Sequence, residues 1–348
     1  MAEQRRKAQQ ILADGYEPAG LNRIAIVAIG GSGLIEQLLQ AEPHAKLTAW
    51  FLDEWAASAA RAWLAEAQPQ ERERVEIRES VDLPVGTWQR ILLPTRLDGD
   101  GELTRELILQ AWERLEPRGE LWASTNNPSD QWLLAELRRW NKRTSIRRQL
   151  DGRVYVATRP ETLPRTRSFS AEVVFRDGER LVKLSTRPGV FAHRKIDAGA
   201  APCLKWRRFA RETESWTLAA AQAAVGRPRV ASRRDPSDGD RFNPRAVEAT
   251  RWACANNGVR DYEVVLSGSA RLDNSHPFDI ALTNPPYYSH HRISRLMVDA
   301  CLERLRVGGR LHVVTKDPRW YLEEYAGRWD EPTLQEARGY FVISTIKR

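Results

Sequence analysis

Short apolar runs alternate with helical stretches along the first half of the chain, a pattern typical of α/β proteins. Ile24–Ile29 is a continuous apolar run, which predicts a strand buried on both faces. Runs of the same kind predict further strands at 46–52, 75–77, 90–93 and 120–123. Helical patterns lie between them, at 34–39, 102–115 and 131–140. Strands that alternate with helices in this way predict a parallel, Rossmann-like sheet.

A glycine-rich turn follows the first of these predicted strands. Gly30–Gly33 stands between that strand and a helix, and Asp53 closes the next strand. This order has the form of a nucleotide-binding βαβ unit, in which glycines let the backbone approach a ligand and the acid meets a ribose. A tight turn in a Rossmann-like domain that binds no nucleotide predicts the same pattern, so both interpretations stay open.

The second half contains an apolar run that ends in an unusual turn. Phe278–Thr283 predicts a buried strand, and Asn284-Pro285-Pro286-Tyr287 follows it. Because proline cannot donate to a sheet ladder, the strand should end there. Asn284 then lies at the carboxyl end of a strand, where open α/β sheets bind their ligands.

This turn suits the chemistry of an amino group on a base. The side-chain carbonyl of Asn284 and the main-chain carbonyl of Pro285 can both accept hydrogen bonds from one amine. Such bonds would localise the lone pair of the amine and direct it at a methyl donor. Tyr287 offers a flat face to a base taken out of its stack. A simple strand-ending turn is the alternative interpretation.

An internal repeat relates the two halves of the chain. The Glu-Arg-Leu of positions 113–115, with glycine at 119 and leucine at 121, recurs 190 positions later, at 303–305, 309 and 311. Each copy predicts the end of a helix, a glycine turn and the next strand. We therefore expect two tandem α/β domains of similar plan, at 1–157 and 171–348. The Pro- and Arg-rich residues 158–170 predict the linker between them.

Composition and charge narrow the possible partners. The chain has 54 Lys+Arg against 46 Asp+Glu, a net charge of +8, which favours a polyanionic partner such as RNA. Its three cysteines have no metal-binding spacing, so we expect no metal site and a reducing, cytoplasmic location. Neither a signal peptide nor a membrane span is predicted. Lys316, which follows a predicted strand, could meet an RNA phosphate, and His290-His291 is expected to precede a surface helix.

Several stretches of the second half occur in the order found in one enzyme family: Pro188–Phe191, Ile196–Gly199, Asn243–Ala249, Asn257–Val259, Phe278–Tyr287, Val313–Lys316 and Gly339–Ile343. The set resembles class I S-adenosylmethionine-dependent methyltransferases. It is similar in particular to the ribosomal RNA guanine-N2 methyltransferases with a duplicated domain and a "methyltransferase small" catalytic half. The resemblance is specific over 171–348 and extends to 1–157 in plan only. It implies two tandem Rossmann-like methyltransferase domains, the first a degenerate copy.

The resemblance also implies a reaction, a partner and two groups of site residues. The reaction is methyl transfer from S-adenosylmethionine to the exocyclic N2 of a guanine, and the partner is ribosomal RNA or a ribosomal subunit. The residues that would hold the guanine amine are Asn284, Pro285, Pro286 and Tyr287. The residues expected near the methyl donor are Phe191, Asp197, Gly199, Asn243, Ser269 and Asn284.

One stretch, residues 203–242, departs from the family pattern. The family has a strand and a loop of the type Val-Leu-Asp-Leu-Gly-Cys-Gly-Thr-Gly near 214–224, whereas Glu214–Ala223 of this chain has no glycine and a helix-like composition. Residues 226–241 show no strand pattern either. Without glycines a Cβ atom would intrude between backbone and cofactor. We therefore expect poor packing over 203–242, loss of the central strand, and weak or no binding of S-adenosylmethionine.

A shifted reading frame is one explanation of this stretch. Trp is encoded by TGG and Thr codons begin with AC, so Trp216-Thr217 read across the codon boundary must give Asp. The neighbouring codons can give Val, Leu, Gly-Cys-Gly and Thr in the same frame, which matches the missing loop. A genuinely diverged segment is the alternative.

Three functions therefore remain open from the sequence. The first is guanine-N2 methylation of ribosomal RNA. The second is an inactive RNA-binding or assembly protein that has lost its cofactor loop. The third is an N-methyltransferase acting on a protein amide or a small amine, because Asn-Pro-Pro-Tyr also serves those reactions.

Overall fold

The structure is a computed structural model of the chain. It describes residues 2–348 except 30, 164, 166, 178, 191, 196–214, 220–227, 233–242, 260–262, 267–276, 286–290 and 338. The chain divides into two compact units that change over between Phe169 and Ser170. Among the described residues, no helix has the length and apolar character needed to cross a membrane.

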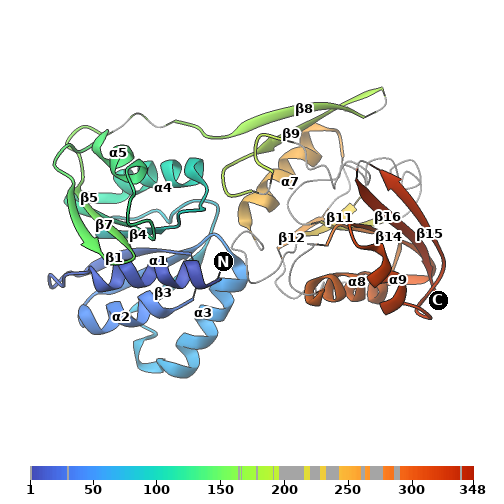
Figure 1. Cartoon of the computed structure of the whole chain (residues 1–348), viewed down its shortest axis with the longest axis horizontal. Helices are drawn as coiled ribbons and strands as arrows, with labels where there is room; N and C mark the ends of the chain where they lie inside the picture. The colour runs from blue at the N-terminus through green and yellow to red at the C-terminus, as the bar shows by residue number, and fades with distance from the viewer. Residues whose placement is uncertain are drawn as a thin grey trace. The chain divides into compact units, whose positions relative to one another are not determined.

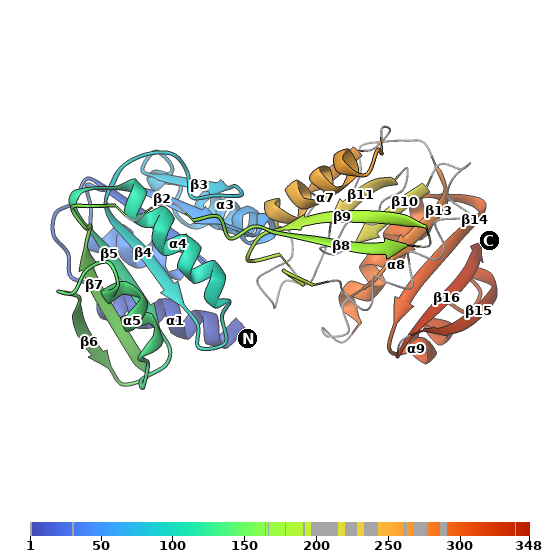
Figure 2. The ribbon, with the colours of Figure 1, turned by 90° about the horizontal axis from the view of Figure 1, so that it is seen from above.

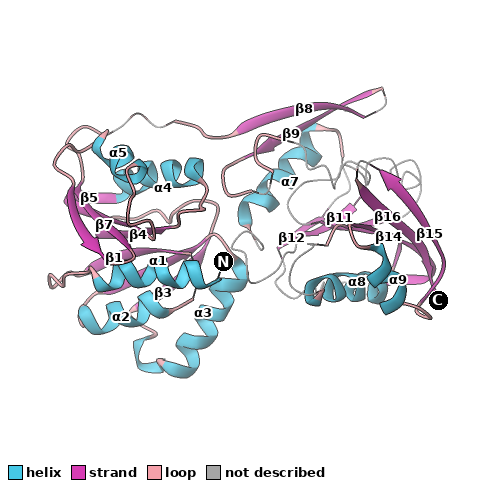
Figure 3. Cartoon of the chain, in the orientation of Figure 1, coloured by secondary structure: helices cyan, strands magenta, loops and turns pink. Residues whose placement is uncertain are grey.

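The first unit is a seven-stranded sheet with helices on both faces (Figures 1 and 3). Its strands follow the order β3-β2-β1-β4-β5-β7-β6, and only β7 runs antiparallel to its neighbours. The strands are β1 (Arg23–Ala28), β2 (Lys46–Phe51), β3 (Val75–Glu79), β4 (Trp88–Thr95), β5 (Leu115–Thr125), β6 (Ser145–Gln149) and β7 (Gly152–Thr158). The helices are α1 (Ala2–Asp14), α2 (Gly33–Ala41), α3 (Glu54–Ala67), the short 3₁₀ helix η1 (Pro69–Glu71), α4 (Gly101–Arg114) and α5 (Trp132–Arg138).

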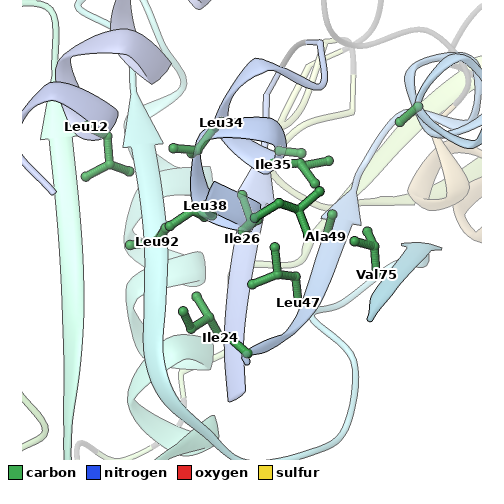
Figure 4. Packing of buried hydrophobic residues seen from close by; sticks show 14 of the residues in the cluster. Leu12, Ile24, Ile26, Leu34, Ile35, Leu38, Leu47, Ala49, Val75 and Leu92 are labelled. Atoms are coloured by element: carbon green, nitrogen blue, oxygen red, sulfur yellow. The ribbon is translucent and has the colours of Figure 1, made fainter. Parts of the chain in front are cut away.

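Alternate residues of each central strand enter opposite layers of the core. Ile24 and Ile26 of β1 pack with α1, α2 and α3, as Figure 4 shows. Ala25 and Val27 of the same strand pack with α4 and α5 instead. Both sets are buried, which explains why β1 reads as a continuous apolar run rather than an alternating one.

The second unit repeats this strand order. Its sheet has the order β12-β11-β10-β13-β14-β16-β15, which matches the first sheet strand for strand, and only β16 is antiparallel to its neighbours. The strands are β10 (Ser215–Ala219), β11 (Pro228–Ser232), β12 (Glu263–Leu266), β13 (Phe278–Thr283), β14 (Leu305–Thr315), β15 (Trp329–Ala337) and β16 (Tyr340–Lys347). The helices are α7 (Pro244–Asn256), α8 (Arg292–Arg304) and α9 (Pro318–Glu324), and a separate hairpin joins β8 (Ala171–Asp177) to β9 (Arg180–Thr186). The predicted architecture of two tandem Rossmann-like sheets is confirmed.

The prediction that 203–242 supplies no strand is wrong for two segments. β10 pairs in parallel with β13, from Ser215 opposite Ile280 to Leu218 opposite Thr283, and β11 pairs with β10 on its other side. Strand formation depends more on available partners than on local composition. The open edge of β13 therefore selects strand geometry for a segment whose composition is helix-like. The rest of 203–242 lies outside the described residues, so its packing stays a prediction.

The internal repeat occupies the same structural positions in both units. α4 ends at Arg114, directly before β5, and α8 ends at Arg304, directly before β14. Three residues after the first residue of β5 and of β14 lies a residue in the left-handed conformation. It is Arg118, with φ 68°, in β5 and Gly308, with φ 75°, in β14. The next residue is glycine in both copies, and 190 positions separate each pair.

The glycines at 119 and 309 lie where the chain passes close to the neighbouring strand. A Cβ on Gly119 would be 2.9 Å from the Glu116 carbonyl oxygen and 3.1 Å from that of Gln89. A Cβ on Gly309 would be 2.9 Å from the Arg306 oxygen and 3.2 Å from the Asp279 oxygen. Because these oxygens belong to the backbone, they cannot move aside cheaply.

Replacing either glycine by alanine should therefore destabilise its own unit. We expect Gly119→Ala and Gly309→Ala each to lower the free energy of unfolding by about 1–3 kcal/mol, as for other overpacked sites. Urea denaturation would measure this. Gly33→Ala is the matched control, because a Cβ there meets nothing within 4 Å. An equal effect of all three substitutions would contradict the close-approach argument.

Candidate active site

Asn284 lies where the strand order of the second sheet reverses. β13 ends at Thr283, which is buried and pairs with Leu218 of β10 on one side and Val313 of β14 on the other. The half-buried Asn284 and the buried Pro285 follow at once. In doubly wound sheets the crevice at the point of reversal is the ligand site. The predicted place of Asn284, at the carboxyl end of a strand, is therefore confirmed.

One predicted site residue, Asn243, contacts the turn after β9. Asn243 is 2% exposed and caps the start of α7, because its Oδ1 accepts a hydrogen bond of 2.9 Å from the Arg245 amide. Its Nδ2 donates to the Gly189 carbonyl at 2.5 Å. Arg245, only 1% exposed, donates from Nη1 to the Pro188 carbonyl at 2.7 Å. Both residues thus hold the Pro188-Gly189 turn from the same helix end.

The local sequence explains this geometry. Pro244 occupies the first position of α7, where its fixed φ favours a helix start, and asparagine is a preferred cap before it. Gly189 has φ 81°, a left-handed conformation that favours glycine. At the far end of α7, Asn257 exchanges two hydrogen bonds with the backbone of Lys183 in β9. Helix, hairpin and turn are therefore tied together at both ends.

Asn243 should be sensitive to loss of its amide donor. Asn243→Ala removes both the cap and the donor to the buried Gly189 carbonyl, so we expect the free energy of unfolding to fall by about 2–4 kcal/mol. Asn243→Asp keeps the cap acceptor but turns an oxygen toward that carbonyl, and it should be at least as destabilising. Urea denaturation is the measurement.

The control for this prediction is an asparagine at the other end of the same helix. Asn256 is exposed, and its Nδ2 bonds only the Trp252 carbonyl one turn earlier. Asn256→Ala should change the free energy of unfolding by no more than about 0.5 kcal/mol. If Asn243→Asp had the same free energy of unfolding as the unaltered protein, the hydrogen bond from Asn243 to Gly189 would not contribute to stability.

Three buried ionisable groups of the second unit are held neutral. Burial raises the pKa of the Cys301 thiol well above its usual range and raises the pKa of Tyr321 to about 12. Burial also lowers the pKa of His312 to about 4, and its Nδ1 lies 2.8 Å from the Ser344 hydroxyl. Since all three are uncharged near pH 7, they contribute packing and neutral hydrogen bonds to the sheet.

Sequence reasoning missed an aromatic contact beside the site. His291 precedes α8, as predicted, but its ring stacks on that of Trp320 with centroids 4.1 Å apart and planes 12° from parallel. Its Nε2 lies 3.5 Å from Asp317 Oδ2. The sequence carries no signal for this contact, because the pairing of the two rings depends on how α8 and α9 pack on the sheet.

The corresponding positions of the first unit are used differently. Asp53, which would meet a ribose under one of the two interpretations of the glycine turn, caps α3 through a hydrogen bond of 2.9 Å from the Ala56 amide. Pro94 occupies the position 190 residues before Asn284 and lies within β4. The first unit therefore has the sheet without the asparagine at the point of reversal.

The remaining predicted site residues lie outside the described part of the chain: Phe191, Asp197, Gly199, Ser269, Pro286 and Tyr287. Their roles stay predictions. Of the predicted set, Asn243, Asn284 and Pro285 are described, and all three belong to the second unit.

Comparisons with known proteins fit this geometry. Residues 181–343 match the family model of the methyltransferase small domain. No curated protein sequence matches the chain. A solved T. thermophilus 16S rRNA N2 G1207 methyltransferase, RsmC, in complex with AdoMet and guanosine, is 17% identical with a TM-score of 0.74, and the match covers 98% of this chain and 92% of that one.

Two further solved structures overlap with about half of the chain. The mitomycin 7-O-methyltransferase MmcR is 15% identical over 45% of this chain and 54% of its own, with a TM-score of 0.37. An O-methyltransferase family protein from Burkholderia thailandensis is 16% identical over 45% and 55%, with a TM-score of 0.36. Residues 181–343, which make up most of the second unit, thus match a methyltransferase small domain, and the candidate site of that unit lies where the strand order of its sheet reverses.

Proposed function

We propose that this protein transfers a methyl group from S-adenosylmethionine to the exocyclic N2 of a guanine in ribosomal RNA. The observation that carries the proposal is the place of Asn284 and Pro285, directly after β13 at the point where the strand order reverses. The likeness in fold to RsmC supports it over nearly the whole chain. Ribosomal RNA or a ribosomal subunit is the proposed partner, in the cytoplasm.

The chain's own part in the reaction is to hold and orient the amine. S-adenosylmethionine, when bound, supplies a methyl group carried on a positively charged sulfur. Asn284 Oδ1 and the Pro285 carbonyl accept the two N–H hydrogens of the guanine amine, which leaves its lone pair directed at the methyl carbon. The donor would supply this methyl group with the electron pair of its S–C bond leaving on sulfur, and Asn284 and Pro285 would hold the amine whose lone pair forms the new N–C bond. The amine nitrogen then loses one proton to water.

Two parts of the second unit would hold the methyl donor: the edge of the sheet where the strand order reverses, and the turn after β9. The crevice between β10 and β13 is the position where this fold binds ligands. The Pro188-Gly189 turn, held by Asn243 and Arg245, leads directly to Phe191, one of the residues expected near the donor. Asn243 and Arg245 would thus orient the turn, and Asn284 would face both donor and base.

Nucleoside analysis tests the proposed reaction. The protein is incubated with isotopically methyl-labelled S-adenosylmethionine and with 16S and 23S ribosomal RNA or with subunits that lack base methylation. The RNA is then digested to nucleosides and separated. We expect the label in N2-methylguanosine when codons 203–242 are read in the shifted frame, which should restore binding of the methyl donor. Label in protein or in a small amine would support the third of the functions left open by the sequence and contradict this one.

A second candidate is favoured by one observation. Residues 214–223, which include β10, contain no glycine. A protein that binds ribosomal RNA without methylating it, as an inactive assembly factor would, is consistent with that composition. If the protein bound RNA but transferred no label in the same assay, the result would support the inactive RNA-binding protein.

A further inference from the structure

A cation and an aromatic ring meet where β14 ends and the antiparallel β16 begins, on the edge of the sheet that carries Asn284. Lys316 follows β14 directly, and Tyr340 begins β16, whose Phe341 pairs with Thr315. The Lys316 Nζ lies 5.0 Å from the centre of the Tyr340 ring. β13, which ends next to Asn284, is the neighbour of β14 on the other side (Figure 2).

The same edge continues into α9. Arg319, in the first turn of that helix, is exposed and makes no ion pair among the described residues. Trp320 beside it carries the stacked ring of His291, whose side chain is about one-third exposed, at 32%. The Asp317 carboxylate lies 3.5 Å from His291 Nε2.

Cations at the opposite edge of the sheet are bound within the protein. Arg306, at the start of β14, pairs with Asp279 at 2.6 Å. Lys347, near the end of β16, donates to the Leu305 carbonyl at 2.7 Å. Arg319, for which the described residues provide no ion pair, and the exposed Lys316 therefore lie at the edge that also carries Asn284.

We propose that this edge binds the RNA strand next to the target guanine. It is formed by Lys316, Arg319, Tyr340 and the His291–Trp320 pair, and we call it the β14 edge. Lys316 and Arg319 would contact backbone phosphates, and the outer face of the His291 ring would stack on an unpaired base. Cations interleaved with rings are the usual surface for single-stranded nucleic acid. The choice of RNA as partner rests on the proposed function.

Salt dependence of RNA binding tests this proposal. The probe is a short fluorescein-labelled single-stranded RNA that contains one guanine, and fluorescence anisotropy is recorded between about 50 and 200 mM KCl without methyl donor. Each lysine–phosphate contact to single-stranded RNA contributes about 0.7 to the slope of log affinity against log salt. We expect Lys316→Gln and Arg319→Gln each to weaken binding and to reduce the slope by about that amount. Lys316→Arg should restore it.

Arg306→Gln is the matched control, since it removes the same charge at the opposite edge. Arg306→Gln should leave the salt slope unchanged. If Arg306→Gln and Lys316→Gln reduced the slope equally, net charge alone would explain the effect, and the proposed role of the β14 edge would be wrong. Slopes identical to that of the unaltered protein in both edge variants would also overturn it. A chain that binds RNA through this edge but leaves guanine unmethylated contradicts the proposed reaction alone. A chain that methylates guanine while Lys316→Gln keeps its slope contradicts the edge alone.

Discussion

Replacing Asn284 by alanine is expected to lower the rate of methyl transfer to guanine by about 10²–10³-fold, as when one preorganised polar group is lost from an active site. The reason is that the alanine cannot accept an N–H of the amine, whose lone pair then stays delocalised into the base. Because Asn284 is half-buried and lies after the end of β13, its loss should not disturb the sheet. Single-turnover transfer of labelled methyl to RNA is the measurement.

Two comparisons make this prediction specific. Asn284→Asp keeps an oxygen at the same place and should retain more activity than alanine does. The free energy of unfolding should be the same for both variants, which separates a chemical role from a structural one. Equal rates for Asn284→Ala and its parent would rule out the amine-holding role. The comparison needs a parent with measurable activity, which the next prediction addresses.

Restoring the family's glycine loop should have an equally large effect on cofactor binding. We expect the chain with its present sequence at 214–223 to bind S-adenosylmethionine weakly or not at all. Reading codons 203–242 in the shifted frame should produce micromolar affinity, because glycines let the backbone approach the donor. A gain from millimolar to micromolar corresponds to about 4 kcal/mol. Calorimetric titration of both proteins measures it.

The control here is the restored protein with its loop glycines changed back to alanine. It should lose the affinity again if close backbone approach is the cause. Micromolar binding by the unaltered chain would contradict the expectation. A restored chain that still fails to bind would refute the frameshift explanation and leave a diverged segment as the account of 203–242.

The sequence predicted those features that depend on contiguous residues. β13 follows from a mainly apolar run closed by two prolines, and the end of α8 before β14 follows from a repeated helix end and glycine turn. The same local pattern predicts Asn284 at the carboxyl end of β13. Local pattern suffices for such features because each element is defined by its own side chains.

Features that depend on distant partners could not be predicted. β10 and β11 form in a stretch of unfavourable composition because β13 and β12 offer them backbone partners. Arg245 reads as a surface cation in its own segment, and only the fold buries it against the Pro188 carbonyl.

The strand order of the second unit also bears on how that unit folds. Ser215 of β10 pairs with Ile280, 65 positions later, whereas Thr315 pairs with Phe341 only 26 positions later and β15 turns directly into β16. Contacts between residues close in sequence close smaller loops and form sooner. β13 to β16 can therefore assemble as a local nucleus on which β10–β12 dock afterwards. With this folding order, changes within residues 203–242 affect a late step of folding. β13 and β14, which lead to Asn284 and Lys316, can therefore form regardless of those changes.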